Sequence, residues 1–412
     1  MKHKICFVLG SYPVLSQPFL YNQILEVMRE PGYHVEIVVF NKTNEKVHQA
    51  YESLNDRVIF FPMGTGAKLL DRLRMSLKAI ISLLFSRPFV FFQALNFFKY
   101  AENAWNLNYV ILANHFKKID ADIMHCHFGT TARTIADLKA IGAIKAPMLA
   151  SFHGMDITVF PKTHGKAYYT RLFKIAEMFT GNSTFIINKM YENGCPPEKT
   201  FKIPECINID QFEYRGSAPV RNVLKIFTVG RFVEKKGYEY SLKAVALLKK
   251  QNIAFQYDIV GEGPLKEKMI ALARELGIEK SVVFHGGMKQ EELKKIYSAS
   301  HIFLLPSVTA ANGDTEGQGL VLQEAQAIGV PVLATLHNGF PDSIIDGKTG
   351  YLVPEKDHVA LYNKLVLLNN NELLCAEMGE LGREFVEQSF DSKIVVKNLL
   401  KLYEILLRIA VK

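Results

Sequence analysis

Residues 306–330, PSVTAANGDTEGQGLVLQEAQAIGV, come directly after an apolar run at 302–305 and end in a helical pattern that begins at Leu320. The segment before the helix consists mainly of small and polar residues, and its glycines are Gly313, Gly317 and Gly319. This order predicts a strand, a loop and a helix. Glycines allow close contact between backbone and ligand, and the free amide groups at the positive end of a helix dipole favour an anion.

Two carboxylates bracket this turn, Glu316 before it and Glu324 inside the helix. Leu320, Glu324 and Ile328 share one helix face, so we expect Glu324 to point inward and to need a hydrogen-bonding partner such as a pair of sugar hydroxyls. Glutamates eight residues apart occur elsewhere in the chain, so the spacing alone carries no weight. Only this pair spans a glycine-rich turn. A structural helix cap is the alternative interpretation.

The length of 412 residues is too great for one ordinary core and predicts two domains of similar size. The net charge of +8 favours anionic partners. Nucleic acid is not expected, because the sequence has no basic strip interleaved with aromatic residues. The five cysteines are scattered and form no C-x-x-C pair, which predicts reduced thiols in a cytosolic protein.

The N-terminus has a basic start and a short apolar run, but no small-residue cleavage site follows, so we interpret it as a buried strand rather than a signal peptide. No segment reaches the roughly 18 uninterrupted apolar residues of a membrane span. We therefore expect a cytoplasmic protein, and the apolar and basic segment at 67–118 predicts a peripheral location on the inner face of the cell membrane.

Short apolar runs in the first half of the chain predict a parallel sheet that is covered on both faces. The expected strands are 4–9, 34–40, 57–61, 122–127 and 147–152. Between the third and fourth strands lies an insertion, residues 67–118, which reads as two long helices separated at Arg87-Pro88.

The second half alternates strands and helices with short loops, which predicts a doubly wound, Rossmann-like sheet. The expected strands are 223–229, 255–260, 282–285, 301–305 and 331–335, and the expected helices are 238–250, 265–276, 291–299 and 320–328. The predicted domains are 1–204, a hinge at 205–221, a second domain at 222–388, and a C-terminal helix at 389–412 that packs back on the first domain.

The turn VGRFVEKKG, residues 229–237, follows the first strand of the second domain. Ligands bind at this edge of a parallel sheet, so Arg231 and Lys236 would lie where a ligand approaches. A diphosphate is recognised well by the bidentate fork of an arginine together with the point charge of a lysine. A solvated basic turn is the alternative interpretation.

The sequence resembles the retaining glycosyltransferases of family 4, in particular exopolysaccharide members of the colanic-acid type. Their signature E-x-F-G-x(4)-E corresponds to EGQGLVLQE at 316–324, with Gln318 in place of phenylalanine, and their G-R-x(4)-K-G corresponds to the turn at 230–237. The resemblance covers nearly the whole chain and is thin over 41–118 and the last twenty residues. It implies a GT-B fold, two Rossmann-like domains that face each other across a cleft.

The resemblance also implies the roles of individual residues toward a nucleoside diphosphate sugar. Arg231 and Lys236 would hold the diphosphate, Glu324 the ribose, and Glu316 the transferred sugar, together with the backbone of Gly317 and Gly319. The G-x-G turn at 261–263 and the segment at 285–288 would approach the nucleotide. The full expected donor set is Arg231, Lys236, Gly261, Gly263, Met288, Glu316, Gly317, Gln318, Gly319, Leu320 and Glu324.

In the first domain, SFHGMD at 151–156 resembles the family's H-G-x-D, whose histidine reaches the donor sugar. HCHFG at 125–129 resembles a run that places His127 at the cleft edge. The expected cleft residues are Gly10, Ser11, His127, His153 and Asp156, and the expected catalytic residues are Glu316, His153, Arg231 and Lys236. His125 and His127 share a strand face and form a possible metal pair, but no third ligand has a suitable spacing, so no metal is expected.

We therefore expect a retaining hexosyltransferase without a cofactor, which uses a nucleoside diphosphate sugar as donor and a glycan or lipid-linked molecule as acceptor in surface polysaccharide biosynthesis. The resemblance implies front-side displacement, since no catalytic nucleophile is evident. A two-carboxylate glycosidase is a rival, but it would have no use for a paired arginine and lysine. A non-catalytic nucleotide-sugar-binding subunit of a synthase is the other rival, and the charged residues that are present disfavour it.

The insertion at 67–118 has eight Lys or Arg and two Asp or Glu. Its apolar stripe is Leu69, Leu70, Leu73, Leu77, Ile80, Ile81 and Leu84, and the cations Lys68, Arg72, Arg74 and Lys78 lie on the same helix. An apolar stripe flanked by cations is typical of a helix in the interface of an anionic leaflet. The stripe could equally cover the sheet of the first domain, an alternative that leaves the excess of basic residues unexplained.

Overall fold

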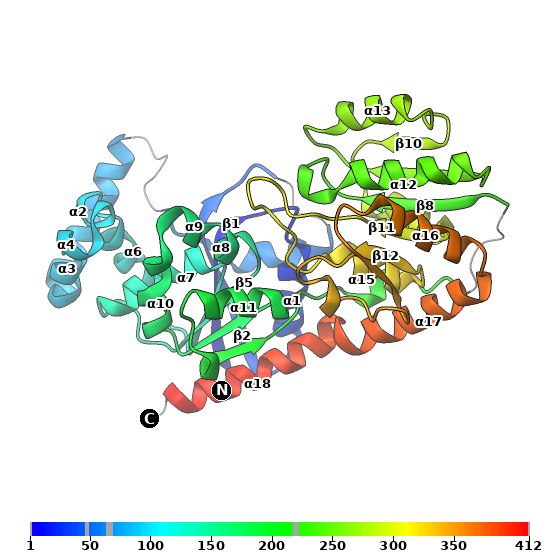
Figure 1. Ribbon diagram of the computed structural model, residues 1–412. Helices are drawn as coiled ribbons and strands as arrows, with labels where there is room; N and C mark the ends of the chain where they lie inside the picture. Colours follow the sequence, from blue (N-terminus) through cyan, green and yellow to red (C-terminus); the bar gives the residue numbers. More distant parts are fainter. Residues whose placement is uncertain (1, 46–48, 63–68, 217–221, 411–412) are drawn as a thin grey trace. The chain divides into compact units, whose positions relative to one another are not determined.

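The computed structural model describes residues 2–45, 49–62, 69–216 and 222–410 (Figure 1). The chain forms two compact units. The first holds residues 1–182, 186–203 and 396–412, and the second holds residues 183–185 and 204–395. Part of the expected hinge, 217–221, and the stripe's neighbour Lys68 lie outside the described residues, as does the side chain of Leu69.

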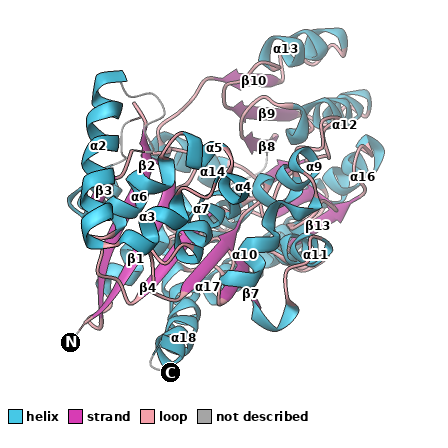
Figure 2. Cartoon of the chain, turned by 90° about the vertical axis from the view of Figure 1, so that its left-hand side faces the viewer, coloured by secondary structure: helices cyan, strands magenta, loops and turns pink. Residues whose placement is uncertain are grey.

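The first unit is built on a seven-stranded parallel sheet with the order β3-β2-β1-β4-β5-β6-β7. Its strands are β1 (His3–Tyr12), β2 (Tyr33–Lys42), β3 (Val58–Phe60), β4 (Ile123–His127), β5 (Met148–Phe152), β6 (Met178–Gly181) and β7 (Thr200–Lys202). Every residue of β4 and β5 is buried, as expected for central strands covered on both faces, and Figure 2 shows helices on either side of the strands. The five expected strands are confirmed, while β6 and β7 are additional.

β1 is longer than expected. Its parallel pairing with β2 continues to Ser11 beside Asn41 and Tyr12 beside Lys42. The expected strand at 4–9 therefore ends too early, because Gly10 and Ser11 also belong to β1, and a helix begins soon afterwards at Pro18. A proline at the first helical position suits the fixed φ of its ring.

The helices of the first unit, apart from the insertion, connect and cover its strands. They are α1 (Pro18–Arg29), α7 (Gly129–Ala140), α8 (Met155–Thr158), α9 (Phe160–His164), α10 (Thr170–Ile175) and α11 (Thr184–Glu192). The C-terminal helix, α18 (Ser392–Ala410), belongs to this unit from Val396 onward. Its Tyr403 is buried and hydrogen bonds to His125 on β4, with 2.7 Å between the hydroxyl and Nδ1.

The insertion is helical, but only its first half is one long helix. It consists of α2 (Leu69–Ser86), α3 (Pro88–Ala94), α4 (Phe97–Tyr100), α5 (Glu102–Trp105) and α6 (Asn108–Phe116). The break at Arg87-Pro88 is confirmed. The second long helix is wrong, because Asn96 caps α4 and because Ala101 and Leu107 adopt positive φ angles of 42° and 55° that no helix continues through.

The second unit holds a six-stranded parallel sheet with the order β10-β9-β8-β11-β12-β13. Its strands are β8 (Leu224–Val229), β9 (Phe255–Val260), β10 (Val282–His285), β11 (Ile302–Leu305), β12 (Val332–Thr335) and β13 (Gly350–Val353). Its helices are α12 (Tyr238–Lys250), α13 (Lys266–Glu275), α14 (Gln290–Ala299), α15 (Leu320–Ile328), α16 (His358–Asn369) and α17 (Glu372–Ser389). The expected alternation of strands and helices is confirmed, and β13 is additional.

Strands β9 and β10 lie on one side of β8 in the sheet, and β11, β12 and β13 lie on the other. Strands β8 and β11 are therefore neighbours although they are distant in sequence. Parallel strands end at one edge of the sheet, so the loops after β8, β11 and β12 lie together. Among the residues that the structure describes, no helix combines the length and the apolar character needed to cross a membrane.

Candidate active site

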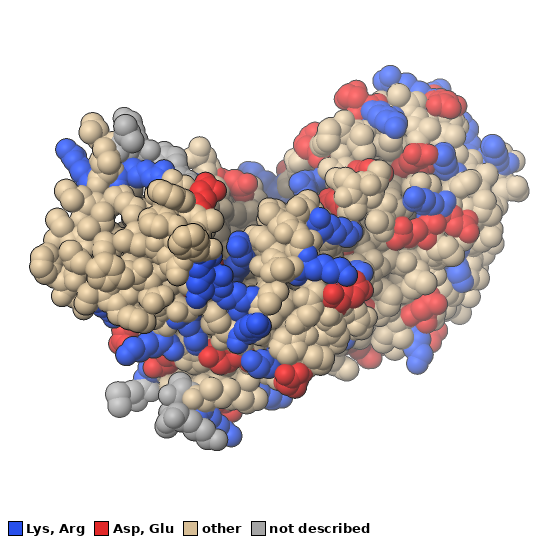
Figure 3. Space-filling view, turned by 60° about the vertical axis from the view of Figure 1, so that its left-hand side comes forward, with Lys and Arg blue, Asp and Glu red and all other residues tan. Residues whose placement is uncertain are grey.

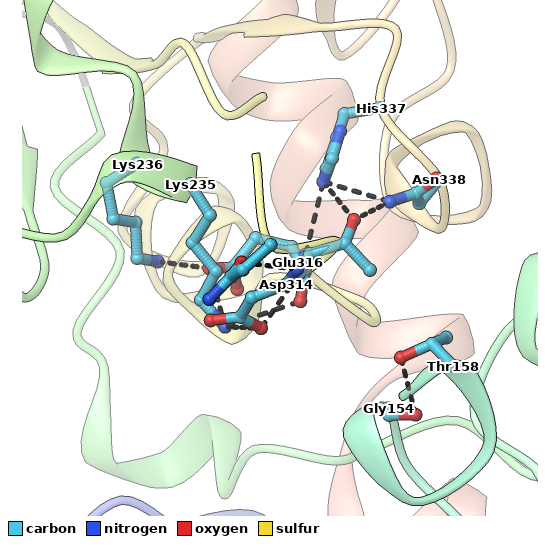
Figure 4. Close-up of polar contacts among 10 residues, drawn as sticks. Gly154, Thr158, Lys235, Lys236, Asp314, Glu316, His337 and Asn338 are labelled. Atoms are coloured by element: carbon cyan, nitrogen blue, oxygen red, sulfur yellow. Dashed lines mark hydrogen bonds and ion pairs between the residues drawn. The ribbon is translucent and has the colours of Figure 1, made fainter. Parts of the chain in front are cut away.

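Two lysines and one glutamate form the centre of the candidate site, at the carboxyl edge of the second sheet. Lys235 and Lys236 lie in the short 3-10 turn Glu234–Lys236 after β8, and Glu316 lies in the loop after β11. Lys236 Nζ is 3.2 Å from Glu316 Oε1, and Lys235 Nζ is 3.7 Å from the same oxygen. Figure 4 shows these side chains pointing toward one another. Their exposed fractions are only 12% for each lysine and 13% for the glutamate, so this charge is concentrated in partly desolvated surroundings.

The turn that carries the lysines depends on a glycine. A Cβ atom at Gly230 would lie 2.9 Å from Lys236 Cε, so the missing side chain allows Lys236 to cross the turn toward Glu316. Arg231 on the same turn is exposed, and its side chain makes no hydrogen bond or ion pair with the described residues. The two residues that contact Glu316 from this turn are therefore Lys235 and Lys236, whereas the Arg231 side chain is exposed to solvent.

Glu316 carries a charge that the lysines hold in place. Burial would raise the pKa of its carboxyl, but the Lys236 and Lys235 ammonium groups outweigh burial, so its pKa lies below the ordinary value. Its Oε1 is buried and accepts no hydrogen bond from the described residues, although both ammonium groups lie nearby. A carboxylate oxygen has room for more than one donor, so a ligand hydroxyl could donate to it beside the ammonium groups.

A histidine holds the backbone of this loop. The backbone N–H of Glu316 donates to His337 Nε2 at 3.1 Å, which places the proton of the ring on Nδ1, where it can donate to Glu355. His337 also lies 2.8 Å from the Thr315 hydroxyl, and Asn338 bonds to both of these groups (Figure 4). Burial lowers the pKa of His337, against the opposing effect of Glu355, so the ring is neutral and can act as the acceptor.

The opposite side of the loop is attached to the lysine turn. Lys235 Nζ donates to Asp314 Oδ1 at 3.2 Å and to the carbonyl of Thr315 at 3.3 Å. The backbone N–H of Ala311 donates to Glu234 Oε1 at 3.0 Å. The loop thus has two sets of contacts, one from the turn after β8 and one from the residues after β12, and Glu316 lies between them.

The loop ends at the N-terminus of α15. Gly319 caps this helix with a left-handed φ of 81° and provides no side-chain acceptor, so the first amide groups of α15 are left without a capping side chain. Leu320 and Val321 are half-buried at this end. Uncapped amides beside two ammonium groups form surroundings that favour an anion.

Glu324 lies one turn inside α15 and has the inward hydrogen bond that its position predicted. The partner is the Tyr297 hydroxyl, 3.1 Å from Glu324 Oε2. Burial raises the pKa of Glu324 to about 7, and the Tyr297 bond opposes this only in part. The two carboxylates therefore differ, with Glu316 firmly ionised and Glu324 able to titrate near neutral pH.

The remaining residues of the expected donor set have structural contacts of their own. A Cβ atom at Gly261 would lie 2.0 Å from the Gly230 carbonyl oxygen, so this glycine lets the loop after β9 pack directly on the lysine turn. Met288 packs against the core beside α14. Gln318, where the family has phenylalanine, is buried and exchanges hydrogen bonds with the backbone of Glu205 at 2.8 and 2.9 Å, so it joins the loop to the start of the second unit.

The histidines of the first unit lie close together at the ends of β4 and β5. His127 Nδ1 is 3.0 Å from His153 Nε2, while His125 is bonded to Tyr403 and to Ser151, at 2.8 Å from the serine hydroxyl. Burial lowers the pKa of His125 to about 3 and also lowers that of His127. Among the described residues, no group of three or more His, Cys, Asp or Glu side chains could hold a metal ion.

Asp156 shapes the backbone beside His153. Its carboxylate accepts the backbone N–H groups of Gly129 at 2.8 Å, His153 at 3.2 Å and Gly154 at 2.8 Å, and the residue is 3% exposed. These contacts fix the loops after β4 and β5. Gly10 and Ser11 lie at the same edge, near the end of β1.

Comparison with known proteins gives the family. Residues 211–385 match the model of the group 1 glycosyl transferases. The chain is 32% identical over 98% of its length to the putative colanic acid biosynthesis glycosyltransferase WcaL of Escherichia coli, all of which is covered. The chain belongs to the group 1 glycosyltransferases. It is also 31% identical, over 97% of its length and 99% of the relative, to the amylovoran biosynthesis glycosyltransferase AmsK of Erwinia amylovora.

The fold of this glycosyltransferase agrees with its family. The solved structure of Anabaena HepE in complex with UDP covers 98% of the chain and 100% of HepE with a TM-score of 0.72, at 15% identity. Two domains, each with a parallel sheet and covering helices, form the GT-B class that the sequence predicted, and the fold prediction is confirmed.

The sequence interpretation of this glycosyltransferase missed two residues of the site. Lys235 is adjacent to Lys236 in the same turn, and the pair of lysines was the signal that could have identified it. His337 comes two residues after β12, and the carboxyl-edge rule that drew attention to Arg231 applies equally to this position.

Proposed function

We propose that this glycosyltransferase is a retaining, metal-independent hexosyltransferase that uses a nucleoside diphosphate sugar. It transfers the hexose to a glycan or lipid-linked acceptor during the synthesis of a surface polysaccharide. It does so as a peripheral protein on the cytoplasmic face of the membrane and without a cofactor.

The cluster of Lys235, Lys236 and the uncapped start of α15 carries this proposal. Two ammonium groups and free helix amides suit the two negative charges of a diphosphate. At about 4 Å and an effective dielectric near 20, each unit pair contributes roughly 4 kcal/mol, and this attraction strengthens as the diphosphate departs. Arg231, exposed on the same turn, is available for a further contact.

Glu316 is proposed to bind the transferred sugar. Its buried Oε1 would accept a hydrogen bond from a sugar hydroxyl, and its position beside Lys236 would place that sugar next to the diphosphate. Glu324 would accept from the ribose, with Tyr297 holding its other oxygen. For the first unit, the assignment of His153 and His127 to the sugar and acceptor rests on the sequence resemblance.

In the proposed reaction the bond between the sugar C1 atom and the diphosphate oxygen breaks, and C1 forms a bond with the acceptor oxygen on the same face. The proton of the acceptor hydroxyl passes to the departing diphosphate. The lysines stabilise the negative charge that develops on the leaving group, the role that a divalent cation has in other phosphate-binding sites. This supports metal independence.

The names of the relatives support a role in the synthesis of a surface polysaccharide. The WcaL and AmsK proteins are named for the biosynthesis of colanic acid and amylovoran. Growing exopolysaccharides are large and polar, so an acceptor carried on a membrane lipid would keep the reaction at the membrane surface.

The test is a screen of UDP- and GDP-hexoses for release of free nucleoside diphosphate, followed by NMR of the product anomer. We expect one donor to be consumed, its anomeric configuration to be kept, and Glu316→Gln to lower the rate. An inverted product would refute retention. If the chain binds a donor but releases no diphosphate when cell extracts that contain the acceptor are added, it is a non-catalytic subunit instead.

A further inference from the structure

The insertion α2–α5 exposes many of its large apolar side chains. Along α2 the exposed positions are Leu70, Leu73, Leu77, Ile81 and Leu84, which recur at helical spacing and form one stripe. Leu70 is 70% exposed and Leu77 is 60% exposed. The alternative in which this stripe covers the sheet is therefore wrong, because the stripe is on the outer side of the helix.

The inner side of α2 explains this orientation. Ser76, Ala79 and Leu83 are buried, and α2 packs against α6. The small side chains Ser76 and Ala79 let the two helices approach closely, and Arg72 holds α2 to the end of α5 by donating to the carbonyl of Asn106 at 3.1 Å. The helix is thus attached through its smaller and more polar face, and a rotation that buried the leucines would break these contacts.

Aromatic residues extend the exposed surface beyond α2. Phe85 is 83% exposed and Phe89 is 69% exposed at the corner between α2 and α3, and Phe98 on α4 is fully exposed. No other described stretch of this length exposes as many large apolar side chains. Apolar patches of this kind mark sites of interaction rather than ordinary surface.

Exposed basic residues outnumber exposed acidic ones on α2–α5: Arg74, Lys78 and Lys99 against Asp71 and Glu102. Figure 3 shows a broad area over the insertion without charged side chains, with Lys and Arg at its margins. Arg74 and Lys78 are exposed on α2, whereas Arg72 and Arg87 are bonded to backbone carbonyls, Arg87 to that of Ala143 at 3.2 Å. The number of cations available for a partner is therefore smaller than the sequence suggested, and the apolar stripe is the larger feature.

We infer that the surface of α2–α5 inserts into the outer part of an anionic lipid leaflet, with the stripe and the phenylalanines among the acyl chains and Arg74 and Lys78 at the headgroups. An apolar stripe with the exposed cations Arg74 and Lys78 beside it matches the acyl chains and the anionic headgroups of such a leaflet. Trp105, 73% exposed beside Phe97, has the amphipathic ring that favours the boundary between headgroups and acyl chains.

This inference rests on the proposed peripheral location, but its test measures no sugar transfer. The chain has a single tryptophan, so the fluorescence of Trp105 reports directly on this surface. The full chain is mixed with vesicles of phosphatidylcholine alone or with added phosphatidylglycerol. We expect binding to the anionic vesicles, a blue shift of the emission, and quenching by lipids brominated on the acyl chains.

Three variants separate the contributions. Leu73→Ser/Leu77→Ser/Ile81→Ser should lower the vesicle partition coefficient at least tenfold, and Arg74→Gln/Lys78→Gln should lower it severalfold and remove most of its salt dependence. The matched control is Val359→Ser/Leu367→Ser/Leu373→Ser, which changes three exposed apolar residues of α16 and α17 and should bind as the unchanged chain does. Circular dichroism checks that each variant is folded.

Several outcomes would overturn the inference: no binding to anionic vesicles, binding without a change in Trp105 emission, or equal binding by the leucine variant. A dimer in solution that the leucine variant dissociates would assign the surface to a second copy of the chain. Release of nucleoside diphosphate with a water-soluble acceptor is measured without vesicles, so failure of the proposed reaction is distinguished from failure of docking.

Discussion

Lys236 Nζ lies 3.2 Å from Glu316 Oε1, and the two residues come from the loops after the adjacent strands β8 and β11. Without a donor sugar, each charge is neutralised by the other. A bound diphosphate would form an ion pair with the Lys236 ammonium group, and a sugar hydroxyl would donate a hydrogen bond to the Glu316 carboxylate. The ion pair therefore preorganises both groups for the charges that the reaction would bring.

We expect Lys236→Ala to lower kcat more than it raises the donor KM, because its charge matters most when the diphosphate departs. The loss should be about 3 kcal/mol, or roughly a hundredfold in kcat. Steady-state kinetics with varied donor measures it. Lys243→Ala is the matched control, since Lys243 forms an exposed pair with Glu239 on α12, and it should leave both constants unchanged. A variant in which only KM rises would contradict the assigned role.

For Glu324 we expect a pH-dependent donor affinity. Burial raises its pKa to about 7, so the carboxyl gains a proton as the pH falls through 7 and loses acceptor capacity for the ribose. The donor KM should rise roughly tenfold between pH 8 and pH 6, since about a tenth of the groups remain ionised one unit below the pKa. Glu324→Gln should raise KM at pH 8 and flatten this profile, with little effect on kcat. Glu267→Gln, on the exposed side of α13, should keep the profile of the unchanged enzyme.

The sequence could predict Glu316 and Lys236 because their signals are local. Each lies in a turn after a short apolar run, and the carboxyl-edge rule places such turns together. His337 and Lys235 gain their importance from contacts across the loop, which depend on the order β8-β11-β12 and on the direction of single side chains. No pattern along the chain encodes those directions.

The orientation of α2 shows a different limit. The apolar stripe was evident from its spacing, but spacing alone cannot tell whether a stripe faces the core or the solvent. The buried side chains Ser76 and Ala79 decide this, because small residues permit the close approach to α6. The short strands β6 and β7 were missed for a related reason, since Thr and Gly within them weaken the apolar signal and the neighbouring strands define them.

We expect turnover to be independent of divalent metal. Lys235, Lys236 and the uncapped amides of α15 lie at the place proposed for the diphosphate, and the exposed Arg231 lies on the same turn, so we expect these groups to stabilise its charge without a cation. Product release in the presence of EDTA should match that in the presence of magnesium within about twofold. Loss of activity in EDTA that magnesium restores would contradict this prediction. Restoration by manganese alone would contradict it as well.

The last prediction concerns His337 as a positioning residue for Glu316. His337→Ala removes the acceptor of the Glu316 backbone N–H and leaves that buried group unpaired, at a cost of roughly 1–3 kcal/mol. Hydrogen exchange should therefore become about ten- to a hundredfold faster in peptides that cover residues 309–319, while peptides from β8 and β12 keep their protection. We expect kcat to fall and the donor KM to rise together, since both the sugar contact and the amides of α15 depend on this loop. His164→Ala, an exposed histidine of the first unit, is the control and should change neither exchange nor kinetics. If exchange in the loop stays slow in His337→Ala, the contacts with Lys235 and Glu234 suffice to hold Glu316, and His337 has no positioning role.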